Sequence, residues 1–414
     1  MQIKAAMIAR RRDVLSVGIG AAVGSACLLS ASARANASDP SGTPIISDDT
    51  NPHRRWAAQK LRGLLNLFLP SFRPDLEMLD EEGIRHDVRH AIAQGFSGTM
   101  PMINWTPPGD PRWAQFHDIV LSEAAGRLPL HGLVPGTNPE RDIALIRRLE
   151  KMGADLIFLA PTHGENISEE ELYHSYRQRV IATGLPVMLY AAQGKGRSFE
   201  GLGPGGIPIG VFDRLADLPN VVAIKVSQPV SLTNTVEICK AVADRISVGP
   251  VNLDFVPLLA RHYHMQWSGQ WNGEAVQTPA HQYGNELLAA CAAHDFVRAE
   301  QVMLDMQPAL DHFFAIQADV IRKGTHPWQH NKFYSWIGGG NGGLLPVEPR
   351  GGGVTVPTLD EAEREQIRSA FRAARLRPSD SPLESFATGR AAYGEGVRLT
   401  DLAATPSFSM TKPG

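Results

Sequence analysis

Short apolar runs alternate with segments of helical periodicity along most of this chain. The runs recur about every 30 residues, which is the spacing of repeated strand-then-helix units. We interpret eight of them as buried strands, over residues 64–69, 98–103, 128–134, 155–160, 186–190, 221–225, 246–249 and 265–269. The intervening pattern predicts helices over residues 81–93, 112–125, 139–152, 169–183, 232–243 and 286–294.

Capping residues support two of these helix starts. Asn138 precedes Pro139, an N-cap followed by proline in the first turn, and Ser168 stands three residues before Glu171, as in a capping box. Eight strand-then-helix units over roughly 230 residues fit a closed (β/α)8 TIM barrel better than an open doubly wound sheet of about six strands. The predicted fold class is therefore α/β, a TIM barrel with a C-terminal helical appendage.

This pattern divides the chain into five parts. The barrel is predicted over residues 58–295 and the helical appendage over residues 296–377, because helical periodicity continues through residues 294–322 and 361–374. Residues 38–57 are rich in Asp, Ser and Pro and predict a linker. Residues 378–414 are rich in Ser, Pro and Gly and predict a mobile tail.

The first 37 residues have the layout of an export signal. Arg10, Arg11 and Arg12 form a basic n-region, residues 16–29 form a mild apolar run, and residues 33–37 contain Ala-x-Ala cleavage patterns. The Arg pair followed by x-Val-Leu resembles a twin-arginine signal, which predicts export to the bacterial periplasm through that machinery. A single membrane anchor is the alternative, but the apolar run is shorter than the about 18 residues that a span requires.

Composition narrows the function classes. The chain of 414 residues has 40 Lys and Arg against 43 Asp and Glu, a net charge of −3, which argues against a nucleic-acid partner. Hydrophobic residues make up 43%, enough for a substantial core. Three cysteines are too few for a disulfide scaffold, and Cys239 and Cys291 are expected to be buried small hydrophobic residues.

Candidate chemistry stands at the ends of two neighbouring strands. TIM barrels carry their active sites at the C-terminal ends of their strands, where Tyr190 ends the fifth run and Lys225 the sixth. A lysine that closes a buried strand must be desolvated or paired, and desolvation supplies the neutral amine that Schiff-base formation requires. The Tyr190 hydroxyl is placed to relay protons. The alternatives are a solvated Lys225 and an ordinarily packed Tyr190.

These two strands resemble those of a known family. Leu185–Tyr190 and Leu218–Lys225 are similar to the fifth and sixth strands of the dihydrodipicolinate synthase/N-acetylneuraminate lyase family, and the resemblance extends over roughly residues 60–375. Further matches are Leu69-Pro70-Ser71-Phe72, residues 151–161, and Ser268-Gly269 with Asn272 in the eighth-strand place. The resemblance implies a Schiff-base aldolase barrel, commonly tetrameric, in which Lys225 forms an imine with pyruvate or another 2-keto acid and Tyr190 assists.

The chain departs from the family where the substrate carboxylate is held. The family's Gly-Thr-Thr-Gly-Glu is replaced by Ile103-Asn104-Trp105-Thr106-Pro107-Pro108-Gly109-Asp110, so Asn104 and Thr106 are the candidate substitutes. His163 stands in place of the second relay tyrosine. Lys195 and Arg197 follow Tyr190 in a Gly-rich insertion and are candidates for binding a second carboxylate, although surface charge is the plainer interpretation.

Other motifs carry less weight. Residues 201–206 and 338–343 both fit G-x-G-x-x-G, but neither joins a strand directly to a helix, so no nucleotide or other cofactor is expected. His262 with His264 and His86 with His90 suggest metal ligands, but the first pair precedes the eighth strand and the second lies on an outer helix. We expect these four histidines to be solvated and no metal to be bound.

The sequence therefore predicts an exported Schiff-base lyase or aldolase that acts on a 2-keto acid. The resemblance also implies that the protein is a homo-oligomer. Because the carboxylate-binding motif is missing, the biosynthetic dihydrodipicolinate synthase reaction is not expected. Two alternatives remain, a non-catalytic periplasmic binding barrel of the same fold and a metal-dependent hydrolase.

Overall fold

The computed structural model describes residues 50–136, 138–161, 167–192, 206–227, 230–269, 273–322, 326–348 and 358–410. The chain divides into two units, Met1–Asp39 and Pro40–Gly414, and every described residue belongs to the second. The predicted signal at residues 1–37 lies outside the described residues.

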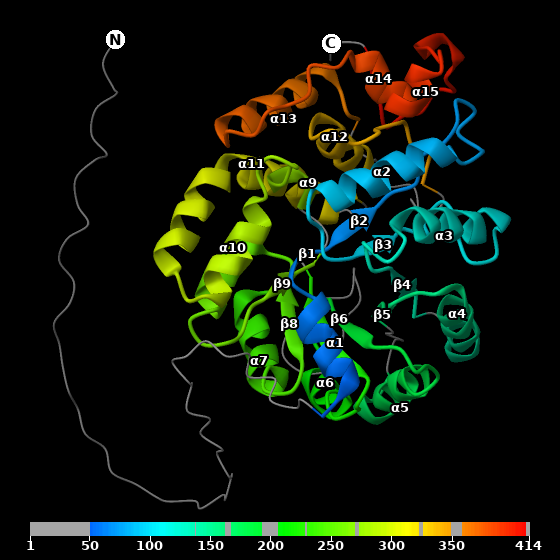
Figure 1. Ribbon diagram of the computed structural model, residues 1–414. Helices are drawn as coiled ribbons and strands as arrows, with labels where there is room; N and C mark the ends of the chain where they lie inside the picture. Colours follow the sequence, from blue (N-terminus) through cyan, green and yellow to red (C-terminus); the bar gives the residue numbers. More distant parts are fainter. Residues whose placement is uncertain are drawn as a thin grey trace, which may run out of the picture. The chain divides into compact units, whose positions relative to one another are not determined.

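Parallel strands at all eight predicted positions form the centre of the second unit (Figure 1). The strands are β1 (Gly63–Leu64), β2 (Asn66–Phe68), β3 (Thr99–Pro101), β4 (His131–Val134), β5 (Leu156–Leu159), β6 (Val187–Ala191), β7 (Val221–Val226), β8 (Ser247–Pro250) and β9 (Trp267–Ser268). The first predicted run contains both β1 and β2, with Leu65 between them.

Hydrogen bonds close these strands into a barrel. Strands β4 to β8 pair in sequence order, β2 pairs with β3, and β1 pairs with β9. A bridge between Thr99 and Leu130 joins β3 to β4, and the Ser268 hydroxyl donates to the carbonyl of Pro250 between β9 and β8. The TIM barrel predicted from the sequence is confirmed.

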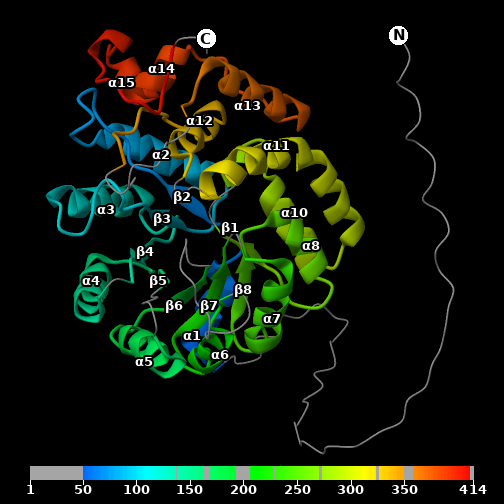
Figure 2. The ribbon, with the colours of Figure 1, turned by 180° about the vertical axis from the view of Figure 1, so that it is seen from behind.

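Helices surround the strands, as the two opposite views in Figures 1 and 2 show. The barrel helices are α2 (Glu81–Ala93), α3 (Pro111–Ala124), α4 (Pro139–Met152), α5 (Glu169–Val180), α6 (Ile209–Leu215), α7 (Leu232–Val242), α8 (Val256–Leu259), α9 (Gly273–Val276) and α10 (Tyr283–Ala292). The predicted caps are confirmed, because Asn138 accepts from the amide of Arg141 and Ser168 forms a capping box with Glu171. Both Cys239 and Cys291 are buried free thiols, as expected.

A helix that the sequence analysis assigned to the linker covers the N-terminal side of the strands. Helix α1 (Pro52–Lys60) begins after Asn51, whose side chain accepts from two backbone amides of the first turn. The Asn51 amide also donates to the carbonyl of Pro219, just before β7. The prediction of a linker over residues 38–57 is therefore wrong from residue 52 onward, since the Asn-Pro cap outweighs the polar composition.

The C-terminal appendage packs beside α2 and α9. It consists of α11 (Phe296–Arg322), α12 (Trp328–Ile337), α13 (Glu361–Ala373), α14 (Leu383–Thr388), α15 (Arg390–Gly394) and a short 3-10 turn at Leu399–Asp401. The prediction of a mobile tail from residue 378 is wrong for residues 378–410. Phe386 is fully buried against Phe333 and Trp336, and the Arg390 guanidinium donates to the carbonyls of Gly340 and Trp336.

Side chains fill the barrel interior from the N-terminal ends of the strands up to Gly249, which pairs with Lys225. The ring of Trp267 occupies the space that a β-carbon at Gly249 would need, 2.4 Å from its position, and the indole donates to the Ser247 hydroxyl at 2.8 Å. His131 is also completely buried there. Because this end is packed, polar chemistry is left to the C-terminal ends of the strands.

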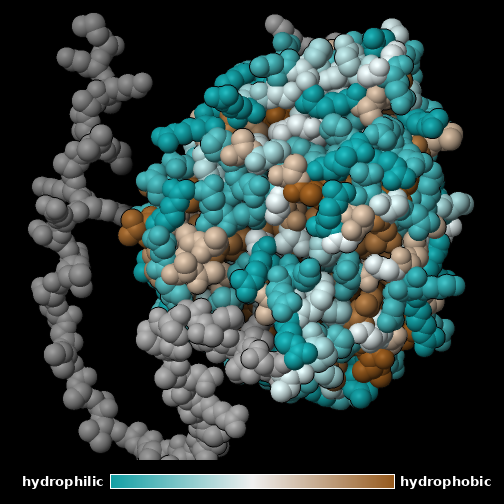
Figure 3. All heavy atoms as spheres, in the orientation of Figure 1, coloured by the Kyte–Doolittle hydropathy of each residue, from teal (hydrophilic) through white to brown (hydrophobic). Residues whose placement is uncertain are grey.

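The surface of the described residues is mixed. Exposed large hydrophobic side chains are Met78, Ile181, Leu258, Val297, Leu304, Val347 and Met410. On the face shown in Figure 3, hydrophobic residues are dispersed among hydrophilic ones, as is usual for protein surfaces. Among the helices that the structure describes, none combines the length and the apolar composition that a membrane span requires.

Candidate active site

Lys225 lies near the C-terminal end of β7 with its side chain inside the barrel. The residue pairs with Tyr190 of β6 on one side and with Gly249 of β8 on the other. Only 4% of the residue is exposed. The amine therefore sits at the end of the barrel where chemistry is expected, and it is largely removed from water.

Aromatic rings surround the Lys225 amine. Its Nζ lies 4.8 Å from the ring centroid of Tyr190 and 5.4 Å from that of Phe158, and the two rings are 5.2 Å apart. Phe158 comes from β5 and is fully buried. Burial penalises the ammonium form and lowers the pKa of Lys225 from 10.5 to about 7. A substantial fraction of the amine is then neutral at physiological pH, as a nucleophile requires.

The hydroxyl of Tyr190 is held by a residue that the sequence analysis did not select. Tyr190 donates to the Ser227 hydroxyl at 2.9 Å, and burial raises the pKa of the phenol, so it stays protonated near neutral pH. Ser227 stands two residues beyond Lys225, on the same side of the extended chain. The strand alternation around Lys225 is the signal that could have identified Ser227.

Gly269 gives the Lys225 side chain its space. A β-carbon at Gly269 would lie 2.9 Å from Cε of Lys225 and 3.0 Å from Cγ2 of Val251. The backbone of Gly269, a predicted site residue, thus packs directly against the side chain of Lys225. Ser268, also a predicted site residue, has a structural contact instead, because its hydroxyl donates to the carbonyl of Pro250.

We expect Gly269→Ala to displace the amine of Lys225 rather than to unfold the barrel, because the atom it meets is the end of a flexible side chain. Reductive trapping of a keto acid should slow by about tenfold, whereas the free energy of unfolding should change by about 1–3 kcal/mol. Trapping rate and urea unfolding measure the two effects, and Gly394→Ala, at an exposed position of α15 with open space around it, controls for substituting a glycine. An unchanged trapping rate would contradict this expectation.

The two candidate carboxylate-binding residues do not share a partner. The Asn104 amide donates to Glu348 of the appendage at 2.5 Å, and the Trp328 indole donates to the other oxygen of that carboxylate at 3.1 Å. Thr106 is fully buried, and its hydroxyl has no hydrogen-bond partner among the described residues. Asn104 is therefore already engaged with a carboxylate of the chain itself. His163, Lys195 and Arg197 lie outside the described residues.

The histidine pairs do not form metal sites in the described part of the chain, where no group of three His, Cys, Asp or Glu side chains could hold a metal ion. His264 contacts the side chain of Gln266, and His86 contacts the carbonyl of Gly339. The expectation that all four histidines are solvated is wrong for His90, which is buried with a pKa lowered to about 4 because burial disfavours its charged form.

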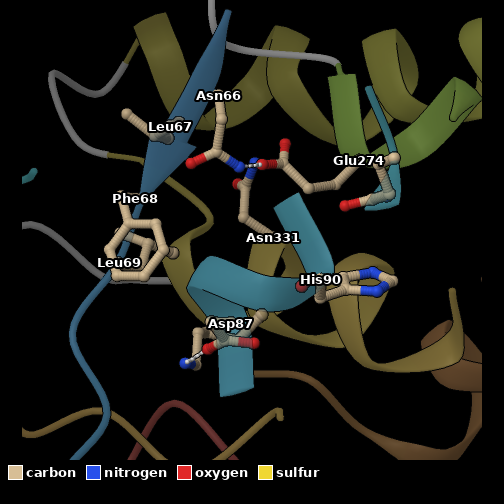
Figure 4. A pocket seen from close by; sticks show the side chains of 11 residues that line it. Asn66, Leu67, Phe68, Leu69, Asp87, His90, Glu274 and Asn331 are labelled. Carbon is tan, nitrogen blue, oxygen red and sulfur yellow. Dashed lines mark hydrogen bonds and ion pairs between the residues drawn. The ribbon is translucent and has the colours of Figure 1, made fainter. Parts of the chain in front are cut away.

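A polar pocket lies outside the strands, between β2 and helices α2, α9 and α12 (Figure 4). Its lining includes Asn66, Asp87, His90, Glu274 and Lys332. Figure 4 shows Asn66 and Glu274 pointing toward one another, and the Asn66 amide donates to the carboxylate at 2.9 Å. Burial raises the pKa of Glu274 from 4.5 to about 7. This pocket lies between the barrel and the appendage, and Lys225 is not part of its lining.

Glu274 makes stability dependent on pH. Because its carboxyl group binds a proton more tightly in the folded than in the unfolded chain, the free energy of unfolding should fall as pH rises from about 4.5 to about 7, by up to about 3 kcal/mol. Glu274→Gln keeps an acceptor for Asn66 and should remove most of this loss. Urea unfolding at several pH values measures it, with the exposed Glu237→Gln as the control; equal pH dependence in wild type and Glu274→Gln would contradict it.

Comparisons with known proteins find relatives of the barrel. The family model described as dihydrodipicolinate synthetase family matches residues 60–249. The 4-hydroxy-tetrahydrodipicolinate synthase of Rhodopseudomonas palustris strain BisA53 is 24% identical over 243 residues, which cover 57% of this chain and 76% of that protein. The enzyme of that name from Bacillus subtilis strain 168 is 32% identical over 108 residues, covering 26% of this chain and 35% of that protein.

Solved structures show the same fold. The dihydrodipicolinate synthase of Acinetobacter baumannii, in a chloride-inhibited form complexed with pyruvate, is 18% identical with a TM-score of 0.58, covering 76% of this chain and 99% of that chain. The dihydrodipicolinate synthase of Thermotoga maritima is 19% identical with a TM-score of 0.58 and the same coverage. Residues 60–249 of this chain are therefore similar to the dihydrodipicolinate synthetase family, and the barrel has the fold of its solved synthases.

Proposed function

We propose that the protein is a lyase of the Schiff-base aldolase class that acts on a 2-keto acid. The observation that carries the proposal is the desolvated Lys225 amine beside Tyr190, at the C-terminal ends of adjacent strands. Similarity of residues 60–249 to the dihydrodipicolinate synthetase family supports the general class.

Each residue has a definite task in the proposed reaction. The neutral amine of Lys225 attacks the keto carbon, and its nitrogen loses a proton as the carbonyl oxygen gains one, which produces a carbinolamine. Tyr190, whose ring centroid lies 4.8 Å from the Lys225 amine, relays these protons and protonates the hydroxyl that leaves as water. In a 4-hydroxy-2-keto acid, the protonated imine at C2 accepts the electron pair released when the C3–C4 bond breaks, while the 4-hydroxyl loses its proton and becomes the carbonyl of the leaving aldehyde. The resulting enamine gains a proton at C3, and water then releases the shortened keto acid from Lys225.

We further propose that the substrate differs from that of the biosynthetic synthase. The chain lacks the family's Thr pair, and the Asn104 amide that would replace it is bound to Glu348. Export is part of the same proposal, on the basis of the twin-arginine pattern at residues 1–37, and it favours a degradative direction over a biosynthetic one. Assembly into a homo-oligomer is proposed from the habit of the family.

Reductive trapping tests the proposal. The full chain is incubated with pyruvate and sodium borohydride, and the modified peptide is located by mass spectrometry. Covalent labelling at Lys225 that requires both reagents supports the proposal. Absence of labelling with pyruvate and with larger 2-keto acids, or labelling at other lysines alone, would overturn it.

A non-catalytic binding barrel is the second candidate, favoured by one observation, the occupation of the Asn104 amide by Glu348. In that case a keto acid should raise the melting temperature of the protein without becoming attached to Lys225 or being turned over. Thermal denaturation with and without pyruvate, run beside the trapping reaction, separates the two candidates.

A further inference from the structure

The hydrogen bond between Tyr190 and Ser227 adds a residue to the site. We propose that Ser227 is the positioning residue that holds the hydroxyl of Tyr190, whose ring centroid lies 4.8 Å from the Lys225 amine. This inference rests on the proposed Schiff-base function and goes beyond it, because it assigns a role to a residue that neither the family resemblance nor the sequence pattern had identified.

Ser227 is itself held by the barrel. Its amide donates to the carbonyl of Ala191 at 2.9 Å, which extends the pairing of β6 with β7 by one residue. Its carbonyl accepts from the amide of Val230 at 3.0 Å. Because alternate residues of an extended chain share a face, Lys225 and Ser227 stand one above the other beside Tyr190. The serine hydroxyl is thus a fixed partner for the phenol.

The residues that replace the family's carboxylate-binding motif do not hold the Tyr190 hydroxyl. The Asn104 amide is bound to Glu348, and the Thr106 hydroxyl has no hydrogen-bond partner among the described residues. In the described part of the chain, the hydroxyl of Tyr190 is hydrogen-bonded to that of Ser227.

A fixed phenol matters because proton transfer depends on geometry. The Tyr190 ring is held by packing on Phe158, but its hydroxyl proton can rotate about the bond from the ring to oxygen. Donation to Ser227 selects one orientation, which turns the remaining lone pairs of the phenol oxygen away from the serine. A general acid or base must lie within about 2.6–3.2 Å of its proton partner, so losing this orientation slows proton transfer without removing the amine.

The test is a double-mutant cycle on the full chain. Ser227→Ala and Tyr190→Phe are made singly and together, with Ser227→Thr as the variant that retains a hydroxyl and the exposed Ser369→Ala as the control. The rate of borohydride trapping with pyruvate is measured as a function of pH and of pyruvate concentration, and folding is checked by thermal denaturation.

We expect Ser227→Ala to lower the maximal trapping rate by about tenfold, with a change of less than about threefold in the half-saturating pyruvate concentration. Ser227→Thr should recover most of the rate. In the Tyr190→Phe background, Ser227→Ala should have no further effect, because the serine acts through the phenol. Because the Ser227 hydroxyl can turn to donate to the phenolate, its presence lowers the pKa of Tyr190, so its loss should also move the alkaline limb of the pH profile upward.

Additive effects of the two substitutions would overturn this role, and so would an unchanged rate and pH profile in Ser227→Ala. In either case, labelling of Lys225 in the wild type would still support the proposed function. Failure of the wild type to be labelled would instead overturn the proposed function.

Discussion

Replacement of Lys225 by methionine is expected to abolish reductive trapping while leaving the barrel folded. The amine is the nucleophile of the proposed reaction, and the neighbouring Tyr190 cannot replace it, because a hydroxyl cannot form an imine. Residual labelling should therefore fall by at least about a thousandfold, the scale on which removal of a nucleophile acts. Methionine retains an unbranched chain that fills the space between Phe158, Tyr190 and Gly269.

Stability separates this result from misfolding. The buried amine is costly to desolvate, so Lys225→Met should leave the melting temperature unchanged or raise it. Lys240→Met, at an exposed position on α7, is the matched control and should trap keto acids at the wild-type rate. Persistent labelling in Lys225→Met would show that another lysine is the nucleophile.

The pH dependence of trapping follows from the same environment. A pKa of about 7 for Lys225 means that the neutral amine is lost below this pH, so the rate should fall about tenfold per pH unit there and level off above it. An ordinary solvated lysine would instead give a rate that keeps rising to about pH 10. The position of this limb in the wild type therefore reports whether the amine is desolvated.

Breaking the ion pair between Lys332 and Asp87 is expected to be the most destabilising change at the junction of the appendage with the barrel. The Lys332 amine lies 3.1 Å from the Asp87 carboxylate and 2.9 Å from the Ser71 hydroxyl. Only 3% and 11% of the two side chains are exposed. Lys332→Met leaves a buried carboxylate without its counterion and should lower the free energy of unfolding by about 3–5 kcal/mol.

A second substitution tests whether this loss comes from the Asp87 carboxylate that is left without its counterion. Asp87→Asn keeps an acceptor for the backbone amide of Asn341, so the double variant Asp87→Asn, Lys332→Met should recover part of the stability lost in Lys332→Met. Urea unfolding measures each value. The control is Arg372→Ala, which breaks an exposed pair with Glu365 and should change the free energy of unfolding by less than about 1 kcal/mol. A loss for Lys332→Met as small as that of the control would refute the argument.

Much of the fold could be predicted from the sequence because it depends on local signals. Alternation of short apolar runs with helical periodicity located all eight strand positions, and capping residues at Asn138 and Ser168 located helix starts. Predictions that relied on composition in place of such signals were wrong. Ser-, Pro- and Gly-rich composition predicted mobility from residue 378, yet Phe386 is buried there by contacts with helix α12, about 50 residues earlier in the chain.

The sequence by itself determined the order of the barrel strands and the presence of a lysine and a tyrosine near the ends of two neighbouring ones, because strand periodicity and residue type are local properties. The tertiary structure alone decided the surroundings of that lysine. Phe158, Gly269 and Ser227 come from three different strands or strand ends, and only closure of the barrel brings them together around the Lys225–Tyr190 pair. The pKa of the amine depends on the water that this closure excludes, a quantity that no local pattern encodes.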